Sequence, residues 1–307
     1  MKILFVGVMD VEWSTNLEMK RGLEQLGHEV DDFNYRSIAT EYDRQMWPFN
    51  MVFFDRTASA VRRVRWLPSF VSNWYWRRAG RGRMRTRLLD QVKTGNYDLV
   101  LFAKTDTLHF EAISEIGEYC ATWFYFMDPS ERSLKVLAPE YAIRADWSSA
   151  SSSDVTNEFR QFGAKSFHMI QGIDTIRFKS APPASNDVIV FAGTRTPDRE
   201  IWIDQLTSAG YSVKCFGHGW ELGPRYAEQL VEEYHNAAIV LNFCQDSSIF
   251  SVRVPQAMAC GAFVLSQKCN DLVTYFDRSE HLDWFETPEE MIDKVGYYLS
   301  NKSNRFS

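Results

Sequence analysis

The sequence predicts an α/β fold built from two doubly wound, Rossmann-like domains. The length of 307 residues suits two domains of ~150 residues each. Short apolar segments alternate with amphipathic ones in two successive series, which is typical of parallel strands joined by helices. Between the two series, Lys179–Asn186 is rich in proline and serine and has no periodicity, which indicates a linker.

The first series opens as a βαβ unit. Lys2–Val8 is an apolar strand, residues 14–26 have helical spacing with Ser14 as the cap, and His28–Phe33 is a second strand. The remaining elements are expected in this order: a helix over 83–94, strand 97–103, helix 110–119, strand 121–126, strand 145–148, helix 153–162 and strand 166–170. Together they make one N-terminal domain.

The second series follows the linker with the same alternation. It comprises strand 187–192, helix 198–209, strand 211–216, helix 224–236, strand 238–243, a short helix and strand described next, and a final amphipathic helix over 289–300. We therefore expect an N-terminal domain over 1–180, a C-terminal domain over 181–288 and a terminal helical segment over 289–307.

The segment Ser251–Leu265 is the most informative motif. It reads as a loop, a short helix that starts at Pro255, a glycine stop at Gly261 and a buried strand. We expect the free backbone N–H groups at the start of this helix to form an anion-binding site. Arg253 would add a positive charge and a planar donor fork, the alternative being a structural ion pair.

At these residues the chain resembles a known family. Val254-Pro-Gln-Ala-Met-Ala-Cys-Gly261 is similar to the donor-site segment of GT-B glycosyltransferases, whose usual form is Leu-Glu-Ala-Met-Ala-Cys-Gly. The resemblance is greatest to the CgeB-like type, which tends to carry an arginine shortly before this helix. It implies a GT-B fold, with two Rossmann-like domains facing a cleft and a last helix that crosses back onto the first domain.

The resemblance also implies which residues hold the donor. It places a diphosphate near Gly193, Arg195 and Arg199, the last standing where related enzymes have a lysine; alternatively, Arg199 pairs with an acid on an exposed helix face. It places the nucleobase or sugar near Gly217, His218 and Trp220, which could equally be a turn with a packed tryptophan.

Two positions depart from the family pattern, and a third candidate for donor contact carries less information. Gln256 stands where family members have the glutamate that holds the ribose hydroxyls, and Ser248 stands where a second glutamate is common. A retaining mechanism therefore does not follow from the resemblance. Asp271 follows a strand and is a candidate for contact with the sugar, although Asn-Asp is also ordinary turn chemistry.

The acceptor would lie on the N-terminal domain. Gly7, Asp10 and Trp13, together with Glu12, follow the first strand and could shape its pocket, or else cap a helix and pack. A general base for the acceptor hydroxyl has three candidates, all after buried strands. They are Asp106, His109 and Asp128, and the sequence does not choose among them.

Composition limits the cofactors and the compartment. The five cysteines are an odd number without a Cys-x-x-Cys pair, and no long apolar span or signal peptide is visible. A cytoplasmic protein without disulfides is expected. No Asp-x-Asp or His/Cys cluster is present either, so we expect no metal and no permanently bound cofactor, only a nucleotide-sugar substrate, with a UDP-sugar as the leading choice.

Residues 56–89 hold ten arginines and no lysine, aspartate or glutamate, in a chain of net charge −6. Aromatic residues interleave with them, so the segment could contact DNA, an anionic membrane surface or the acidic remainder of its own chain. The anionic contact would use Arg62, Arg63, Arg65, Arg77, Arg78, Arg81, Arg83, Arg85 and Arg87.

The sequence thus predicts a glycosyltransferase of the hexosyl or pentosyl type, which moves a sugar from a nucleotide sugar to an acceptor hydroxyl without a metal. The acceptor (a glycan, a small molecule, a lipid-linked group or DNA) stays open. Three alternatives also remain: an enzyme that glycosylates a hydroxylated DNA base through the arginine-rich segment, a non-catalytic GT-B-like binding or structural protein, and a sugar-nucleotide epimerase.

Overall fold

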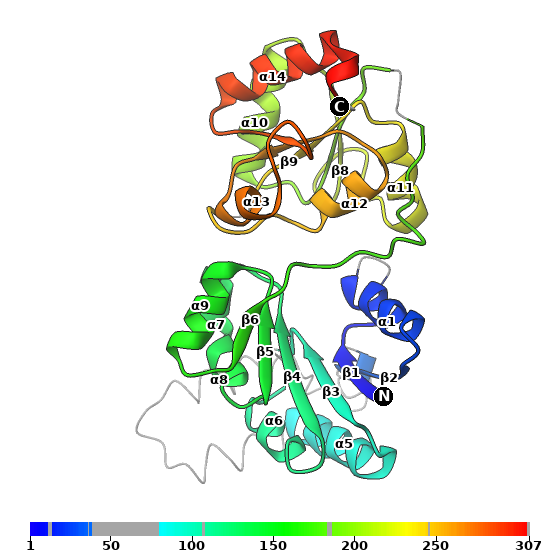
Figure 1. The fold of residues 1–307 in the computed structure, drawn as a ribbon, viewed down its shortest axis with the longest axis vertical. Coiled ribbons are helices and arrows are strands. Elements are labelled where there is room, and N and C mark those ends of the chain that lie inside the picture. The colour runs from blue at the N-terminus through cyan, green and yellow to red at the C-terminus, as the bar shows by residue number, and fades with distance from the viewer. Residues whose placement is uncertain are drawn as a thin grey trace, which may run out of the picture. The chain divides into compact units, whose positions relative to one another are not determined.

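The computed structural model describes residues 1–11, 14–35, 37–38, 80–105, 108–182, 186–244 and 246–305, with the side chains of 80–83 excepted. The chain folds into two compact units, Met1–Ile170 and Gln171–Ser307 (Figure 1). Each unit is an α/β domain with a parallel sheet, so the predicted class is confirmed. The boundary expected after residue 180 lies further along the chain than the observed one.

Unit 1 is built on a six-stranded sheet. Every strand pair in it is parallel, and the strand order is β2-β1-β3-β4-β5-β6. The strands are β1 (Lys2–Gly7), β2 (Glu29–Asn34), β3 (Leu99–Ala103), β4 (Ala121–Phe126), β5 (Trp147–Ala150) and β6 (Ser166–His168). Both faces of β1 and β3 are apolar because helices cover the two sides of the sheet.

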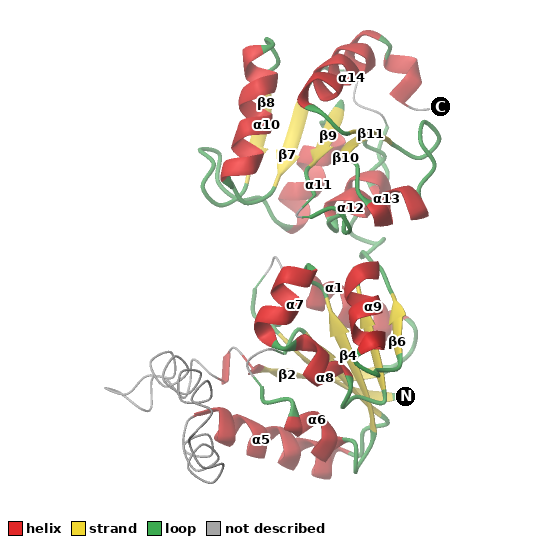
Figure 2. Cartoon of the chain, turned by 90° about the vertical axis from the view of Figure 1, so that its left-hand side faces the viewer, coloured by secondary structure: helices red, strands yellow, loops and turns green. Residues whose placement is uncertain are grey.

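Helix α1 (Thr15–Gln25) packs Met19 and Leu23 against one face of this sheet, and the Ser14 side chain caps it as predicted. The other face carries the larger core, which includes Leu88, Ile113 and Phe159. The helices after α1 are α5 (Gly80–Gly95), α6 (Glu111–Ile116), α7 (Ser130–Val136), α8 (Ala138–Ala142) and α9 (Ser153–Gln161); Figure 2 shows them in red beside the yellow strands.

Unit 2 has a five-stranded parallel sheet in the order β11-β10-β9-β7-β8. Its strands are β7 (Ile189–Ala192), β8 (Val213–Phe216), β9 (Ile239–Asn242), β10 (Val264–Gln267) and β11 (Asp283–Phe285). The chain adds β8 on one side of β7 and β9 on the other. The strand order therefore reverses between β7 and β9, where open α/β sheets bind their ligands.

The helices of unit 2 are α10 (Pro197–Ser208), α11 (Ala227–His235), α12 (Arg253–Ala259), α13 (Asn270–Tyr275) and α14 (Pro288–Ser300). Helices α10 and α14 lie against each other and share one core with the sheet. Thr196 and Thr287 cap them, each followed by a proline in the first turn. Among the described helices, none is both long and apolar enough to cross a membrane.

The start of α12 corrects one expectation. The helix begins at Arg253 rather than Pro255, and the Gln256 N–H donates to the Val252 carbonyl (3.1 Å). Because proline has no N–H and the Gln256 N–H is already used, neither residue offers the free donor that was expected near residues 255–257. The stop at Gly261 is confirmed, with φ +78° in the left-handed region.

Among the described residues, the sequence did not predict four short elements: α7, α8, α13 and β11. Each spans three to seven residues. A segment of that length holds too few turns for its apolar spacing to stand out.

Candidate functional site

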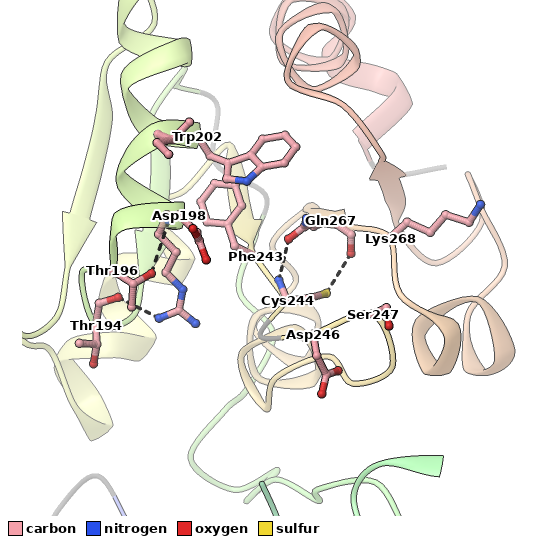
Figure 3. A pocket seen from close by; sticks show the side chains of 12 residues that line it. Thr194, Thr196, Asp198, Trp202, Phe243, Cys244, Asp246, Ser247, Gln267 and Lys268 are labelled. Atoms are coloured by element: carbon pink, nitrogen blue, oxygen red, sulfur yellow. Dashed lines mark hydrogen bonds between the residues drawn. The ribbon is translucent and has the colours of Figure 1, made fainter. Parts of the chain in front are cut away.

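A pocket of about 730 Å³ opens at the carboxyl ends of β7, β9 and β10, over the point where the strand order reverses. Figure 3 shows its side chains arriving from the loop after β7 and α10 on one side, and from the loops after β9 and β10 on the other. The pocket is lined by Thr194, Thr196, Asp198, Arg199, Ile201, Trp202, Phe243, Cys244, Asp246, Ser247, Gln267 and Lys268.

Aromatic contacts and hydrogen bonds hold the part of the pocket wall that lies against the sheet. The Trp202 ring stacks on Phe243 (centroids 6.0 Å apart, 29° between planes), and Phe243 contacts Phe191 (5.0 Å). The loop after β9 is held by hydrogen bonds: Asp246 Oδ1 accepts from the N–H groups of Ser248 and Ile249. These contacts fix the pocket before any ligand binds.

Two arginines flank the Phe191 ring, each with its guanidinium carbon 5.6 Å from the ring centroid. Arg199, from α10, is only 7% exposed, and its Nη1 donates to the Thr194 carbonyl (2.8 Å). Arg253, from α12, has buried Nε and Nη2 atoms with no hydrogen-bond partner among the described residues. Nor does any acid in the described part of the chain form an ion pair with either arginine.

The electrostatics of this pair favour an anionic ligand. Burial lowers the pKa of Arg199, and it lowers that of Arg253 to about 10, with the nearby Arg199 charge as the second cause. The shift of Arg199 expresses the cost of burying a cation, and the shift of Arg253 adds the cost of a second cation nearby. An oxyanion that accepts from both guanidinium groups would remove that cost.

Glycines let the backbone approach this arginine pair closely. A Cβ at Gly193 would lie 2.7 Å from Arg253 Nη1, and a Cβ at Gly217 would lie 2.1 Å from the Gly193 carbonyl oxygen. The Gly193 N–H donates to Phe216 O (2.7 Å), which ties the loop after β7 to the end of β8. The loops after β7 and β8 are therefore joined at the carboxyl edge of the sheet.

Replacing Gly217 with alanine is expected to destabilise the protein. Its φ of +137° strains any side chain by about 1–3 kcal/mol, and the clash with the Gly193 backbone adds to that cost. Gly210→Ala is the matched control, because its φ is +92° but nothing lies within 4 Å of the added Cβ. Urea unfolding should show a larger loss for Gly217→Ala, and equal losses would contradict the packing argument.

Of the other donor candidates after β7 and β8, Arg195 and His218 are exposed and Trp220 is partly buried. Arg195 is exposed and pairs with Glu200, so the acid partner considered for Arg199 belongs to Arg195. His218 is exposed, and its Nε2 lies 3.0 Å from the Tyr226 hydroxyl. Trp220 donates from Nε1 to the Gly193 carbonyl (2.9 Å) and packs edge-on against Phe191, as the core alternative requires.

Two more donor candidates are buried. Gln256 is 6% exposed and lies one turn after Arg253 in α12. Asp271 is buried at the start of α13, and its N–H donates to the Ser248 carbonyl (2.9 Å). The structure thus brings Gly193, Arg199 and Arg253 together and leaves Arg195 apart from them.

The acceptor candidates belong to unit 1. Gly7 ends β1, and a Cβ there would lie 2.7 Å from the Asn16 amide; Asp10 is exposed in the loop that follows. Asp128, after β4, contacts Lys104 Nζ through both carboxylate oxygens (2.9 and 2.7 Å). His109 Nδ1 accepts from the Glu111 N–H (3.3 Å) at the start of α6.

Several predicted residues lie outside the described part of the chain: Glu12, Trp13, Asp106 and Arg56–Arg78, together with the side chains of Arg81 and Arg83. Within the arginine-rich segment, Arg85 is described, and its Nε donates to Glu115 (2.7 Å). That contact fits the option in which the segment pairs with acids of its own chain.

Sequence reasoning missed the aromatic and polar lining of the pocket, above all Trp202, Phe243 and Cys244. Phe243 and Cys244 end a predicted buried strand, and this place in an α/β sheet is the signal that could have found them. Trp202 lies inside a helix that was predicted, but its spacing does not distinguish a residue that lines a pocket from one that packs in the core. Among the described residues, no three His, Cys, Asp or Glu side chains gather to hold a metal ion.

Comparisons with known proteins bear on the fold and on unit 2. Residues 195–307, less than half of the chain, match a family model described as glycosyl transferase-like. The match covers most of unit 2, including Arg199, Arg253 and every residue of the pocket lining except Thr194. A search of curated proteins found no match.

Solved structures match nearly the whole chain. Anabaena HepE in complex with UDP-glucose has a TM-score of 0.65 at 16% identity, over 99% of this chain and 91% of HepE. Sucrose-phosphate synthase from Thermosynechococcus elongatus has a TM-score of 0.65 at 13% identity, with the same coverage. A glycosyltransferase from Rickettsia africae has a TM-score of 0.64 at 11% identity, over 99% of this chain and 92% of that one. At these identities the likeness shows the fold, and the chain has the GT-B fold that its sequence predicted.

Proposed function

We propose that this protein is a glycosyltransferase that moves a sugar from a nucleotide-sugar donor to an acceptor hydroxyl. The observation that carries the proposal is the pair of guanidinium groups, Arg199 and Arg253, which lie beside the pocket of unit 2 and have no acid partner among the residues that the structure describes. The glycosyl transferase-like match over this unit and the UDP-glucose complex of HepE support the choice of a nucleotide sugar as the anion.

The donor site of the proposal centres on Gly193, Arg199, Arg253 and Gln256. The two arginines bind the diphosphate, the glycine lets it approach the backbone, and Gln256 contacts the ribose. Further contacts to the nucleotide sugar come from Arg195, Gly217, His218 and Asp271. A UDP-sugar, of either the hexosyl or the pentosyl kind, and the CgeB-like subgroup are the finer choices that the motif around Arg253 favours.

In the chemical step, the bond between the sugar C1 and the diphosphate oxygen breaks while the acceptor oxygen bonds to C1. The leaving diphosphate gains negative charge, which the two guanidinium groups stabilise. This is the charge that a metal ion neutralises in other transferases, so the proposal is metal-independent. The acceptor hydroxyl gives its proton to a base of unit 1.

The acceptor side of the proposal uses Gly7, Asp10 and Trp13, with Asp128, Asp106 or His109 as the base. Of these, Asp128 is the described carboxylate whose position is fixed most firmly, by Lys104. Asp128 must lose its contact with the Lys104 ammonium before its carboxylate accepts a proton. The incoming acceptor hydroxyl would displace the ammonium. The acceptor itself is a hydroxyl compound of a kind still to be identified.

Thermal stability against a panel of nucleotides tests the function. UDP, GDP, dTDP, CMP and their sugars would be added in turn, and a ligand that binds only the folded state raises the melting temperature. We expect a shift with one diphosphate family, and release of that nucleoside diphosphate from its sugar when an acceptor is present. No shift from a folded sample would overturn the proposal, and binding without transfer or hydrolysis would favour a non-catalytic protein.

A further inference from the structure

Gln267 is a pocket residue whose side-chain amide the fold holds in one orientation. It ends β10 and lines the pocket of unit 2. Its Oε1 accepts from the Cys244 N–H (3.1 Å), and its backbone carbonyl accepts from Cys244 Sγ (3.2 Å), as the dashed lines in Figure 3 show. Because a backbone N–H only donates, the amide oxygen must face Cys244, and the amide nitrogen must face away from it.

The amide nitrogen of Gln267 is left for a ligand. No residue in the described ranges accepts a hydrogen bond from Nε2, and the side chain is only partly buried. Ligand pockets gain specificity from a few polar groups of this kind, which the fold orients but does not satisfy. The ligand group that meets Nε2 must be a hydrogen-bond acceptor, such as a hydroxyl or carbonyl oxygen.

Asp198 supplies the opposite chemistry on the other side of the pocket. It lies in the first turn of α10, lines the pocket, and forms no hydrogen bond or ion pair with another described residue. Figure 3 shows it across the pocket from Gln267. Asp246 differs, because its Oδ1 already accepts from its own loop. A ligand that accepts from Gln267 and donates to Asp198 is most simply one that carries several hydroxyl groups, since a hydroxyl does both.

The proposed donor site leaves this pocket to the sugar. In that site Arg199 and Arg253 hold the diphosphate, and Gln256 contacts the ribose. Of these three residues, Arg199 lines the pocket, whereas Arg253 and Gln256 do not. Arg253 and Gln256 both belong to α12, so the nucleoside would leave the diphosphate on the side of that helix. The pocket would then receive the group bonded to the other phosphate, which in a nucleotide sugar is the sugar.

We propose that Gln267 is a specificity-determining residue of the donor site, whose amide N–H2 group donates to a hydroxyl of the transferred sugar. The inference rests on the proposed function and adds to it the part of the donor that the pocket binds. Cys244 has the supporting role, because its N–H fixes the amide in the orientation that presents the donor.

The test compares two variants of Gln267, with UDP and UDP-glucose as the probes. Gln267→Met fills much of the same space without an amide, so isothermal titration should give a Kd for UDP-glucose about tenfold weaker than that of the wild type. The Kd for UDP should stay unchanged, because UDP has no sugar to reach position 267. The melting temperature without ligand should fall slightly, because the Cys244 N–H loses its acceptor.

Gln267→Glu is the matched control for the contact with Cys244. A carboxylate oxygen still accepts from the Cys244 N–H, so this variant should melt like the wild type, but it has no donor for the sugar. The ratio of the Kd for UDP-glucose to the Kd for UDP should therefore rise in both variants, and taking the ratio removes the effect of the added charge on the diphosphate.

A ratio equal to that of the wild type in either variant would overturn the inference and leave the proposed function standing. If the nucleotide panel selects another base, the matching diphosphate and its glucose derivative replace UDP and UDP-glucose. A wild type that binds no nucleotide of the panel would overturn both the inference and the proposed function.

Discussion

Arg253→Ala is expected to weaken nucleoside diphosphate binding by about 100-fold, since hydrogen bonds to a charged group contribute about 1.5–3 kcal/mol. The Nε and Nη2 donors of Arg253 are buried and have no partner in the described part of the chain, so no contact seen there has to be broken before the ligand binds. Alanine removes both donors and one of the two positive charges that face the ligand. Titration of the variant with UDP measures the loss.

The same substitution should act on stability in the opposite direction. Without ligand, Arg253 is a cation with buried donors and no acid partner within the described ranges, so its removal should leave the melting temperature unchanged or raise it. Arg278→Ala is the matched control in unit 2: Arg278 Nε donates to Asp283 (2.7 Å), so this variant should melt earlier and bind UDP normally. If Arg253→Ala lowers the melting temperature and binds UDP normally, Arg253 is a structural residue and the proposed donor site is wrong.

The succession of most strands and helices along the chain could be predicted because it follows from local pattern, whereas the role of Arg253 in donor binding stays a prediction. Apolar runs of four to six residues bounded by glycine and polar residues identify strands. An arginine just before a short helix in an α/β sheet falls at the carboxyl edge, where ligands bind. The start of α12 was missed because Pro255 fits any position of a first turn, where no N–H is needed.

Which arginine is buried could not be read from the chain. Arg195 and Arg199 both lie within reach of Glu200 in sequence, but the first pairs with it at the surface and the second turns inward beside Phe191. Burial and pairing are set by packing between β7, α10 and α12, which one sequence does not display.

The Asp128–Lys104 contact shows a similar limit in unit 1. Lys104 has a φ of +50°, in the left-handed region, immediately after β3. This backbone turn accompanies the approach of its ammonium to Asp128, which follows the neighbouring strand β4. The sequence showed two polar residues after two buried strands, but the pairing between them depends on strands lying side by side.

Asp283→Asn is expected to destabilise unit 2 by about 3 kcal/mol at pH 7, the usual effect of removing one partner from a buried charged pair. The Asp283 carboxylate is buried at the start of β11 and accepts from Lys294 (2.5 Å), Arg278 (2.7 Å) and the Tyr298 hydroxyl (2.9 Å). An amide cannot accept from both cations as a carboxylate does. Urea unfolding should show the loss, and hydrogen exchange should localise it to β11 and α14.

The effect should also depend on pH with a definite sign. Burial by itself raises the pKa of Asp283, but the hydrogen bonds from Lys294, Arg278, the Trp284 N–H and Tyr298 outweigh it and hold the pKa below its ordinary value. The stabilisation is therefore complete above the ordinary carboxyl pKa of about 3.9 and disappears as the pH falls through the lower folded value. Wild type and Asp283→Asn should converge in acid, whereas Asp187→Asn, which loses an exposed pair with Lys302, should match the wild type throughout. A gap between wild type and Asp283→Asn that stays constant down to the lowest pH would mean that the carboxylate charge does not stabilise the unit.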